Sequence, residues 1–362
     1  QIATKKYVDD TAALTDTLQE VFDASSSPNI TTDTSKPVSF RNGDALNTDN
    51  VLVIENIAGT TTATIDGAGL LTTEDLRVND TTVHVGFQAG LTSQGTLTVA
   101  VGNDAGTTSQ GANSVAIGNL AGNSAQSSQS VAIGDTAGET AQDILSVAIG
   151  PISGNSSQGS RSVAIGSDTG TLTQGNNAVA IGSTAGKSNQ GNITVAIGSA
   201  AGRTSQGDNS VAMGNHAGND TQGSEAVSIG DNAGQTSQGN LAVAIGDLAG
   251  QTNQGISSVA IGDASGQTAQ GSISVAIGND AGNSSQSANS VAIGNNAANA
   301  SQGTLSVAIG ASAGQTTQGA NSIAMGVTAG NSSQGASSVA IGDASGQTAQ
   351  GSISVAIGND AG

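Results

Sequence analysis

One short segment of the chain resembles a phosphate-binding loop. Residues 182–188 read GSTAGKS, and a Lys-Ser pair after a glycine is the part of such loops that reaches phosphates and Mg²⁺. A phosphate-binding loop has four residues between its two glycines, whereas this segment has three. Both glycines also recur at fixed intervals along the chain, so the segment predicts no nucleotide site.

The other residues with catalytic or metal-binding chemistry are too scattered to form a site. The two histidines, His84 and His216, are far apart, and cysteine is absent, which excludes disulfides and thiolate metal sites. Five aspartates follow a recurring glycine and would attract a divalent ion if they were aligned: Asp135, Asp231, Asp247, Asp263 and Asp343. Only Asp231, Asp247 and Asp263 follow consecutive recurrences of that glycine. We interpret all five as solvated turn residues and expect no enzyme, cofactor or metal.

The composition also opposes an ordinary globular enzyme. The 362 residues include 53 Gly, no Trp, one Tyr and three Phe, and aromatic side chains supply much of the buried area in ordinary cores. Eight basic residues against 27 acidic ones give a net charge of −19, which repels nucleic-acid phosphates and anionic lipid. No apolar run approaches the roughly 18 residues that a membrane span needs. We therefore expect no nucleic-acid partner and no membrane span.

A 16-residue repeat occupies residues 83–362. Its unit reads S-V-A-I-G-x-x-A-G-x-x-x-Q-G-x-x, and eighteen units follow one another without insertion or deletion. The first glycine is present in every unit from Gly86 to Gly358, and the glutamine in every unit from Gln94 to Gln350. Such strict spacing is typical of a solenoid, in which each unit packs on its neighbours. The repeat predicts an all-β fold, a stacked parallel β-roll or β-helix.

Each unit predicts one coil with two short strands and two corners. The first strand alternates, so Val115 and Ile117 should point to one face, and Ser114 and Ala116 to the other. The second strand is polar and ends at the glutamine, whose side chains we expect to stack as a ladder of amides. Stacked coils advance about 4.8 Å each, whereas the units of a β-spiral would advance more than twice as far. The polar second strand favours the stack.

The thin interior of such a coil predicts association between chains. The centre of the first strand is Ala in every unit except those of His84 and Ser228. Small side chains let a second surface approach closely, so we expect a parallel homotrimer with the Ala-Ser face near its axis. The alternative is a monomeric solenoid, in which the alanine face is closely packed but meets no other chain.

The segment before the array, 1–82, predicts a different organisation. Residues 1–23 lack Gly and Pro, which indicates a helix. Alternating spacings of four and three residues predict the seam of a short coiled coil over Tyr7, Thr11, Leu14, Leu18 and Val21. A lone amphipathic helix is the alternative. A linker over 24–36 then leads to a small β region over 37–82, with strands expected at 38–41, 51–55, 60–65 and 76–78.

The last unit stops partway through its coil at Gly362. Residues 257–282 and 337–362 are identical, with an offset of five units. We therefore expect the array to continue beyond residue 362.

Several segments resemble viral fibre proteins. Residues 3–10, ATKKYVDD, resemble the A-T-K-x-Y-V-D segment of many bacteriophage tail fibres, and residues 60–72 are similar to their short β segments. Units such as 99–111, VAVGNDAGTTSQG, resemble repeats in fibre proteins of marine phages and large algal viruses. The S-V-A-I-G strand is also similar to the head repeat of bacterial trimeric autotransporter adhesins, whose unit is shorter. That resemblance implies a trimeric, left-handed parallel β-roll.

These observations favour a structural fibre of a virus. We expect the shaft of a tail or capsid fibre, an extracellular appendage of the virion, whose N-terminal side contacts virion or tail proteins. Host receptors would be bound only by a tip outside this chain. The alternatives are a bacterial trimeric surface adhesin and an ice-binding solenoid with stacked Ser/Thr strands such as 107–109.

Overall fold

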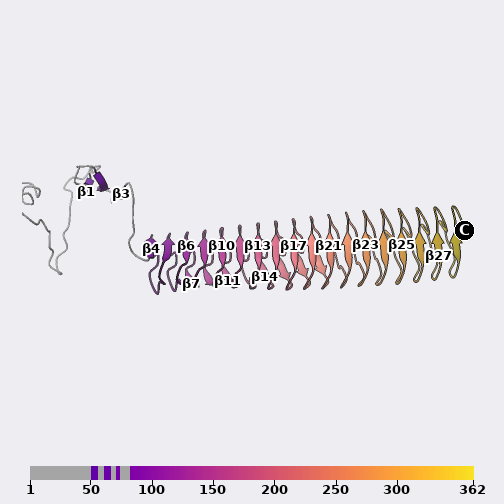
Figure 1. Cartoon of the computed structure of the whole chain (residues 1–362), viewed down its shortest axis with the longest axis horizontal. Coiled ribbons are helices and arrows are strands. Elements are labelled where there is room, and N and C mark those ends of the chain that lie inside the picture. Colours follow the sequence, from indigo (N-terminus) through magenta and orange to yellow (C-terminus); the bar gives the residue numbers. More distant parts are fainter. Residues whose placement is uncertain (1–49, 56–60, 67–70, 74–81) are drawn as a thin grey trace, which may run out of the picture. The chain divides into compact units, whose positions relative to one another are not determined.

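The computed structural model describes residues 50–55, 61–66, 71–73 and 82–362 (Figure 1). The chain divides into two compact units, residues 1–77 and 78–362. The helix predicted over 1–23, the linker over 24–36 and the strands predicted at 38–41 and 76–78 lie outside the described residues. Every regular element of the described residues is a strand.

The first unit contains a small antiparallel sheet with the strand order β1-β2-β3. Strands β1 (Asn50–Glu55) and β2 (Thr61–Asp66) lie where strands were predicted. Strand β3 (Leu71–Thr73) lies at a position that was not among the predicted strands.

The second unit is a stack of coils, each contributing one strand to a long parallel sheet (Figure 1). In chain order this first sheet comprises β4 (Thr82–Val85), β5 (Thr98–Val101), β6 (Val115–Ile117), β8 (Val131–Ile133), β10 (Val147–Ile149), β12 (Val163–Ile165), β13 (Val179–Ile181), β15 (Val195–Ile197), β17 (Val211–Met213), β19 (Val227–Ile229), β21 (Val243–Ile245), β22 (Val259–Ile261), β23 (Val275–Ile277), β24 (Val291–Ile293), β25 (Val307–Ile309), β26 (Ile323–Met325), β27 (Val339–Ile341) and β28 (Val355–Ile357).

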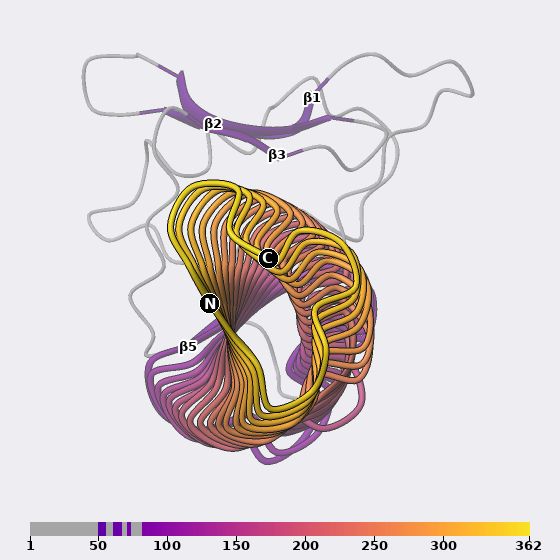
Figure 2. The ribbon, with the colours of Figure 1, turned by 90° about the vertical axis from the view of Figure 1, so that its right-hand side faces the viewer.

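Every strand of the first sheet pairs with the equivalent residues of the next coil. Val147 lies beside Val163, for example, and Ile149 beside Ile165. This in-register pairing of each unit with the next confirms the stacked roll and excludes the β-spiral. Seen end on in Figure 2, each coil is slightly rotated against the one before, as the natural twist of β-strands requires.

A second, polar wall forms the opposite side of each coil. Its strands, all between residues 124 and 238, form two short sheets: β7 (Ser124–Gln126), β9 (Thr140–Gln142) and β11 (Ser156–Gln158) in one, and β14 (Ser188–Gln190), β16 (Thr204–Gln206), β18 (Asp220–Gln222) and β20 (Thr236–Gln238) in the other. In other coils single parallel bridges, such as Gln302 to Gln318, replace these strands. Two walls and two corners per unit confirm the predicted coil.

The interior of each coil is lined by small side chains and one glutamine. In the coil of β6, Ser114 and Ala116 are fully buried and Gln126 is 1% exposed. Val115 is half-buried and Ile117 is 37% exposed, both on the outer face of the strand. The alternation was therefore predicted correctly, but the expectation that the Ala-Ser face lies at an axis between chains was wrong. That face is covered by the second wall of its own coil.

The buried glutamines form the expected ladder in part: amide-to-amide bonds run without a break from Gln126 to Gln174, and elsewhere they join only single pairs of coils. Gln142 Nε2 donates to the backbone oxygen of Val131 on the facing strand at 2.8 Å and to Gln158 Oε1 in the next coil at 3.1 Å. Gln126 donates in the same way to Gln142, at 3.0 Å. Where Ser228 replaces alanine, its hydroxyl accepts a hydrogen bond from Gln222 Nε2 and donates one to Gln238 Oε1 at 2.7 Å. The glutamine thus spans the coil and ties neighbouring coils together.

The glycine after the first strand is required at the corner. Gly118 has a φ of 130°, and a Cβ there would lie 2.4 Å from the backbone oxygen of Gly134 in the next coil. A side chain would therefore clash with the stack as well as strain the backbone, which explains why this position is glycine in all eighteen units.

Candidate functional site

The segment that resembles a phosphate-binding loop is an ordinary corner of the stack. A phosphate loop needs free backbone N–H groups that point at the anion. Here Gly182 N donates to Ile165 O, Thr184 N to Ser167 O and Gly186 N to Ala201 O, each at 2.9 Å. These donors are engaged in the bonds between coils, so the segment does not form a phosphate cradle.

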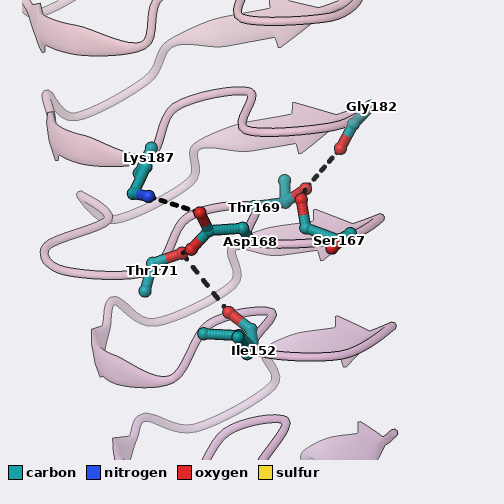
Figure 3. Close-up of polar contacts among 7 residues, drawn as sticks. All are labelled: Ile152, Ser167, Asp168, Thr169, Thr171, Gly182 and Lys187. Atoms are coloured by element: carbon teal, nitrogen blue, oxygen red, sulfur yellow. Dashed lines mark hydrogen bonds and ion pairs between the residues drawn. The ribbon is translucent and has the colours of Figure 1, made fainter.

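Lys187 of that segment is engaged in an ion pair along the stack. Its Nζ donates to Asp168 Oδ2 in the preceding coil (Figure 3). Asp168 Oδ1 accepts the hydroxyl of Thr171 at 2.9 Å, and Thr169 donates to the carbonyl of Gly182. A pair that is still in contact with water, as this half-buried one is, contributes little stability. Its role is local packing between coils.

The predicted histidine and aspartate positions do not converge. His84 lies in β4 at the start of the array, and His216 lies at a corner eight coils further on. The row Asp231, Asp247 and Asp263 is bounded by amides, because Asn215 Nδ2 donates to Asp231 at 2.9 Å and Asn279 Nδ2 to Asp263 at 3.2 Å. Within the described residues, no group of three or more His, Cys, Asp or Glu is placed to hold a metal ion.

Titration of the full chain with Ca²⁺ is therefore expected to show no stoichiometric binding transition by calorimetry. Carboxylates one coil apart, about 4.8 Å, are exposed to water, and two of the three in the row already accept an amide. The matched control is Asp247→Asn, which removes the central carboxylate. A tight transition in the parent chain that Asp247→Asn abolishes would overturn this interpretation.

The hydroxyl row on the second wall is also engaged with the backbone. Thr92, Thr108 and Thr140 each donate to a carbonyl of the next coil, at 3.2, 3.1 and 3.0 Å. A flat ice-binding lattice needs hydroxyls presented outward in regular ranks. These hydroxyls bond along the stack, and the neighbouring outward position varies, for example Ala125, Asn189 and Thr221, which speaks against the ice-binding alternative.

One outer surface of the array is continuous and aliphatic. We call it the aliphatic face. It is formed by the first and third residues of the Val-Ala-Ile strands, which are Val, Ile or Met in all eighteen coils. In-register pairing places these side chains in two unbroken rows. The third residue is substantially exposed in several coils, for example 39% at Met213 and 37% at Ile229.

The aliphatic face is large for a surface in water. Eighteen coils at about 4.8 Å span roughly 80 Å, and three strand residues are about 10 Å wide, which gives about 800 Å². Monomeric proteins seldom expose a contiguous apolar patch above about 600 Å². A standard protein interface buries about 800 Å² on each partner. The face therefore has the size and chemistry of an interaction surface.

The prediction from sequence missed this face because it took the Ala-Ser face, and not the Val and Ile side chains, as the surface that meets other chains. A signal was present in the repeat itself. The third position accepts Val101, Ile117 and Met213, whereas the alanine position admits only Ser228 away from the first coil. Tolerance of different sizes marks a surface, and intolerance marks a filled interior.

Comparison with known proteins gives no relative: no protein family, no curated protein and no solved structure matches the chain. Among the described residues, no helix is long and apolar enough to cross a membrane.

Proposed function

We propose that this chain is the shaft of a viral appendage, a tail or capsid fibre exposed at the virion surface, whose work is mechanical. The observation that supports it is the unbroken, in-register stack from β4 to β28. A rod about 80 Å long results, in which backbone hydrogen bonds join successive coils. Such a rod provides reach and stiffness.

The rigidity of the proposed shaft has a clear physical source. Each coil donates backbone hydrogen bonds in both directions; Val147 N, for example, donates to Ser162 O, and Gly150 N to Ile133 O. The buried glutamines add side-chain bonds between coils. Bending the rod would lengthen these bonds on one side, which opposes deformation.

The proposed shaft assembles as a parallel homotrimer through the aliphatic face. This face replaces the Ala-Ser face that the sequence suggested, because the alanines are already buried in each coil. A copy of the same chain offers a surface of the same length and coil spacing. The face carries no charge, so the net negative charge of the chain does not oppose contact there.

The N-terminal side of the proposed shaft would attach to virion or tail proteins, as its resemblance to phage tail fibres implies. A bacterial trimeric surface adhesin is the second candidate, favoured by the S-V-A-I-G strands of the stacked sheet. Genomic context separates the two: tail or capsid genes beside this one support the fibre, and a downstream membrane anchor supports the adhesin.

Light scattering of the full chain is expected to give three times the single-chain mass of 34.6 kDa. A variant with Ile149→Glu, Ile181→Glu and Met213→Glu should dissociate, because burying three carboxylates in an apolar interface is strongly unfavourable. Electron microscopy should show the array as a rod of about 80 Å.

The matched control places the same charges in the same coils on the exposed second wall, as Ser157→Glu, Asn189→Glu and Thr221→Glu. It should keep the trimer mass, and both variants should keep the β-sheet circular dichroism. A parent chain of single-chain mass, or a face variant that remains trimeric, would contradict assembly through the aliphatic face.

A further inference from the structure

A second line of exposed aliphatic residues runs along one corner of the array. It lies at the residue two before the first valine of the strand. In seven coils this residue is Leu or Ile, and we call these seven the corner knobs: Leu97, Leu145, Ile193, Leu241, Ile273, Leu305 and Ile353. All are substantially exposed, from 42% at Leu145 to 87% at Ile353.

The corner knobs are unfavourable for the isolated coil in two respects. Their backbone is left-handed, with φ between 54° and 61°, a conformation that bulky and β-branched residues rarely adopt. Their side chains gain little burial in the chain itself. Most other coils have Asn, Ser or another polar residue at this position, such as Asn209 and Asn289, and Asn tolerates left-handed backbone well. The knobs therefore serve something outside the single chain.

The distribution of the knobs indicates what covers them. Because the coils stack in register, the seven lie along one line, from the second coil to the last. Sixteen coil spacings of about 4.8 Å make this line about 77 Å long. A globular domain of about 100 residues has a radius of gyration of only about 13 Å and would contact a few knobs at most. A second copy of this chain has the required length.

The intervals between knobs are unequal and give the line a direction. Along the chain, successive knobs are separated by three, three, three, two, two and three coils. Two copies bring all seven knobs to matching heights only when they are parallel and begin at the same coil. If one copy is shifted by one coil along the other, no knobs lie at matching heights, and a shift of three coils leaves four knobs matched. An antiparallel copy cannot match all seven, because the intervals read differently in reverse.

We propose that the knob lines of neighbouring copies pack against one another and fix the register of the assembly. The proposal rests on the self-association proposed above. The aliphatic face is nearly the same in every coil, so sliding one copy by one coil would cost it only one coil of contact. The knobs remove this degeneracy, because a slip of a single coil separates every matched pair.

The test compares two variants of the full chain, one in which two knobs are removed and one in which the same two knobs are moved by one coil. The removed variant carries Ile193→Asn and Ile273→Asn. The moved variant adds Asn209→Ile and Asn289→Ile, which restores both knobs one coil further on, in exposed corners of the same kind. Because all copies of the moved variant are identical, their knobs match again. Removal should weaken assembly at least about tenfold, and moving the knobs should restore it.

Register is read separately from affinity. The chain has no cysteine, so a spin label on Ser157→Cys, on the exposed second wall, reports distances between copies alone. The parent and the moved variant should give one narrow distance distribution, and the removed variant a broad one, because each slip offsets the labels by about 4.8 Å along the rod and slips of several coils lengthen the distance between them. Circular dichroism checks that each variant keeps its fold.

The outcomes distinguish this proposal from the proposal of self-association on which it rests. A parent chain that does not associate would overturn both. A parent that associates, while knob removal changes neither affinity nor the distance distribution, would overturn only the knob proposal. Failure of the moved variant to recover would also overturn it, since that result assigns the knobs to another binding surface.

Discussion

Replacing Ala196 by leucine is expected to destabilise the coils around β15 by about 1–3 kcal/mol or more. Ala196 is fully buried between Ala180 and Ala212 of the adjacent coils. Its Cβ would lie 3.3 Å from a Cβ built on Gly202, and Gln206 crosses the same interior to reach Val195 O at 2.9 Å. Three further carbon atoms have no space there.

Hydrogen exchange followed by mass spectrometry measures this effect coil by coil, which suits an array whose coils contact only their neighbours. Faster exchange is expected in the coils flanking Ala196→Leu, at any protein concentration. The control is Val195→Leu, one residue earlier on the outer face, where exchange should hardly change. If Ala196→Leu left exchange unaltered, the alanines could not be the filled interior.

The stacking of the coils could be predicted from the sequence, because it follows from the period. A repeat interval that never changes allows a ladder in which each residue lies beside its own equivalent, as Gln142 lies beside Gln158, and the polar second strand favoured this ladder over a spiral. The recurring glycine identified the corner, as Gly118 shows. The glutamine ladder followed from the same reasoning, since identical amides at one coil spacing can bond to each other.

Which face of the first strand points into the coil could not be predicted in the same way. Alternation separates Val115 and Ile117 from Ala116, but it does not state which set faces inward. The width of the interior decides this, and the width depends on Gln126, which reaches the carbonyl of Val115 at 2.9 Å across the coil. With the amide in that space, only a side chain as small as alanine or serine fits opposite it. The interaction surface was missed for the same reason.

Replacing Gln158 by methionine is expected to have the second large effect, because methionine keeps the length but loses the amide. Gln158 Nε2 donates to Val147 O at 2.8 Å and to Gln174 Oε1 at 3.1 Å, and its Oε1 accepts from Gln142 at 3.1 Å. Substitution leaves these buried partners without a bond, at about 1–3 kcal/mol for each unsatisfied group.

Gln334→Met is the matched control for Gln158→Met. Both glutamines are almost fully buried, 1% exposed at Gln158 and 2% at Gln334. Gln334 Nε2 donates to Ile323 O at 2.7 Å and to Ser338 O at 3.4 Å, but its Oε1 accepts no hydrogen bond. Its replacement therefore interrupts no amide ladder, and the increase in amide exchange of the flanking coils should be smaller than for Gln158→Met. Equal increases would show that the glutamines act through the facing strand alone and that the ladder between coils adds no stability.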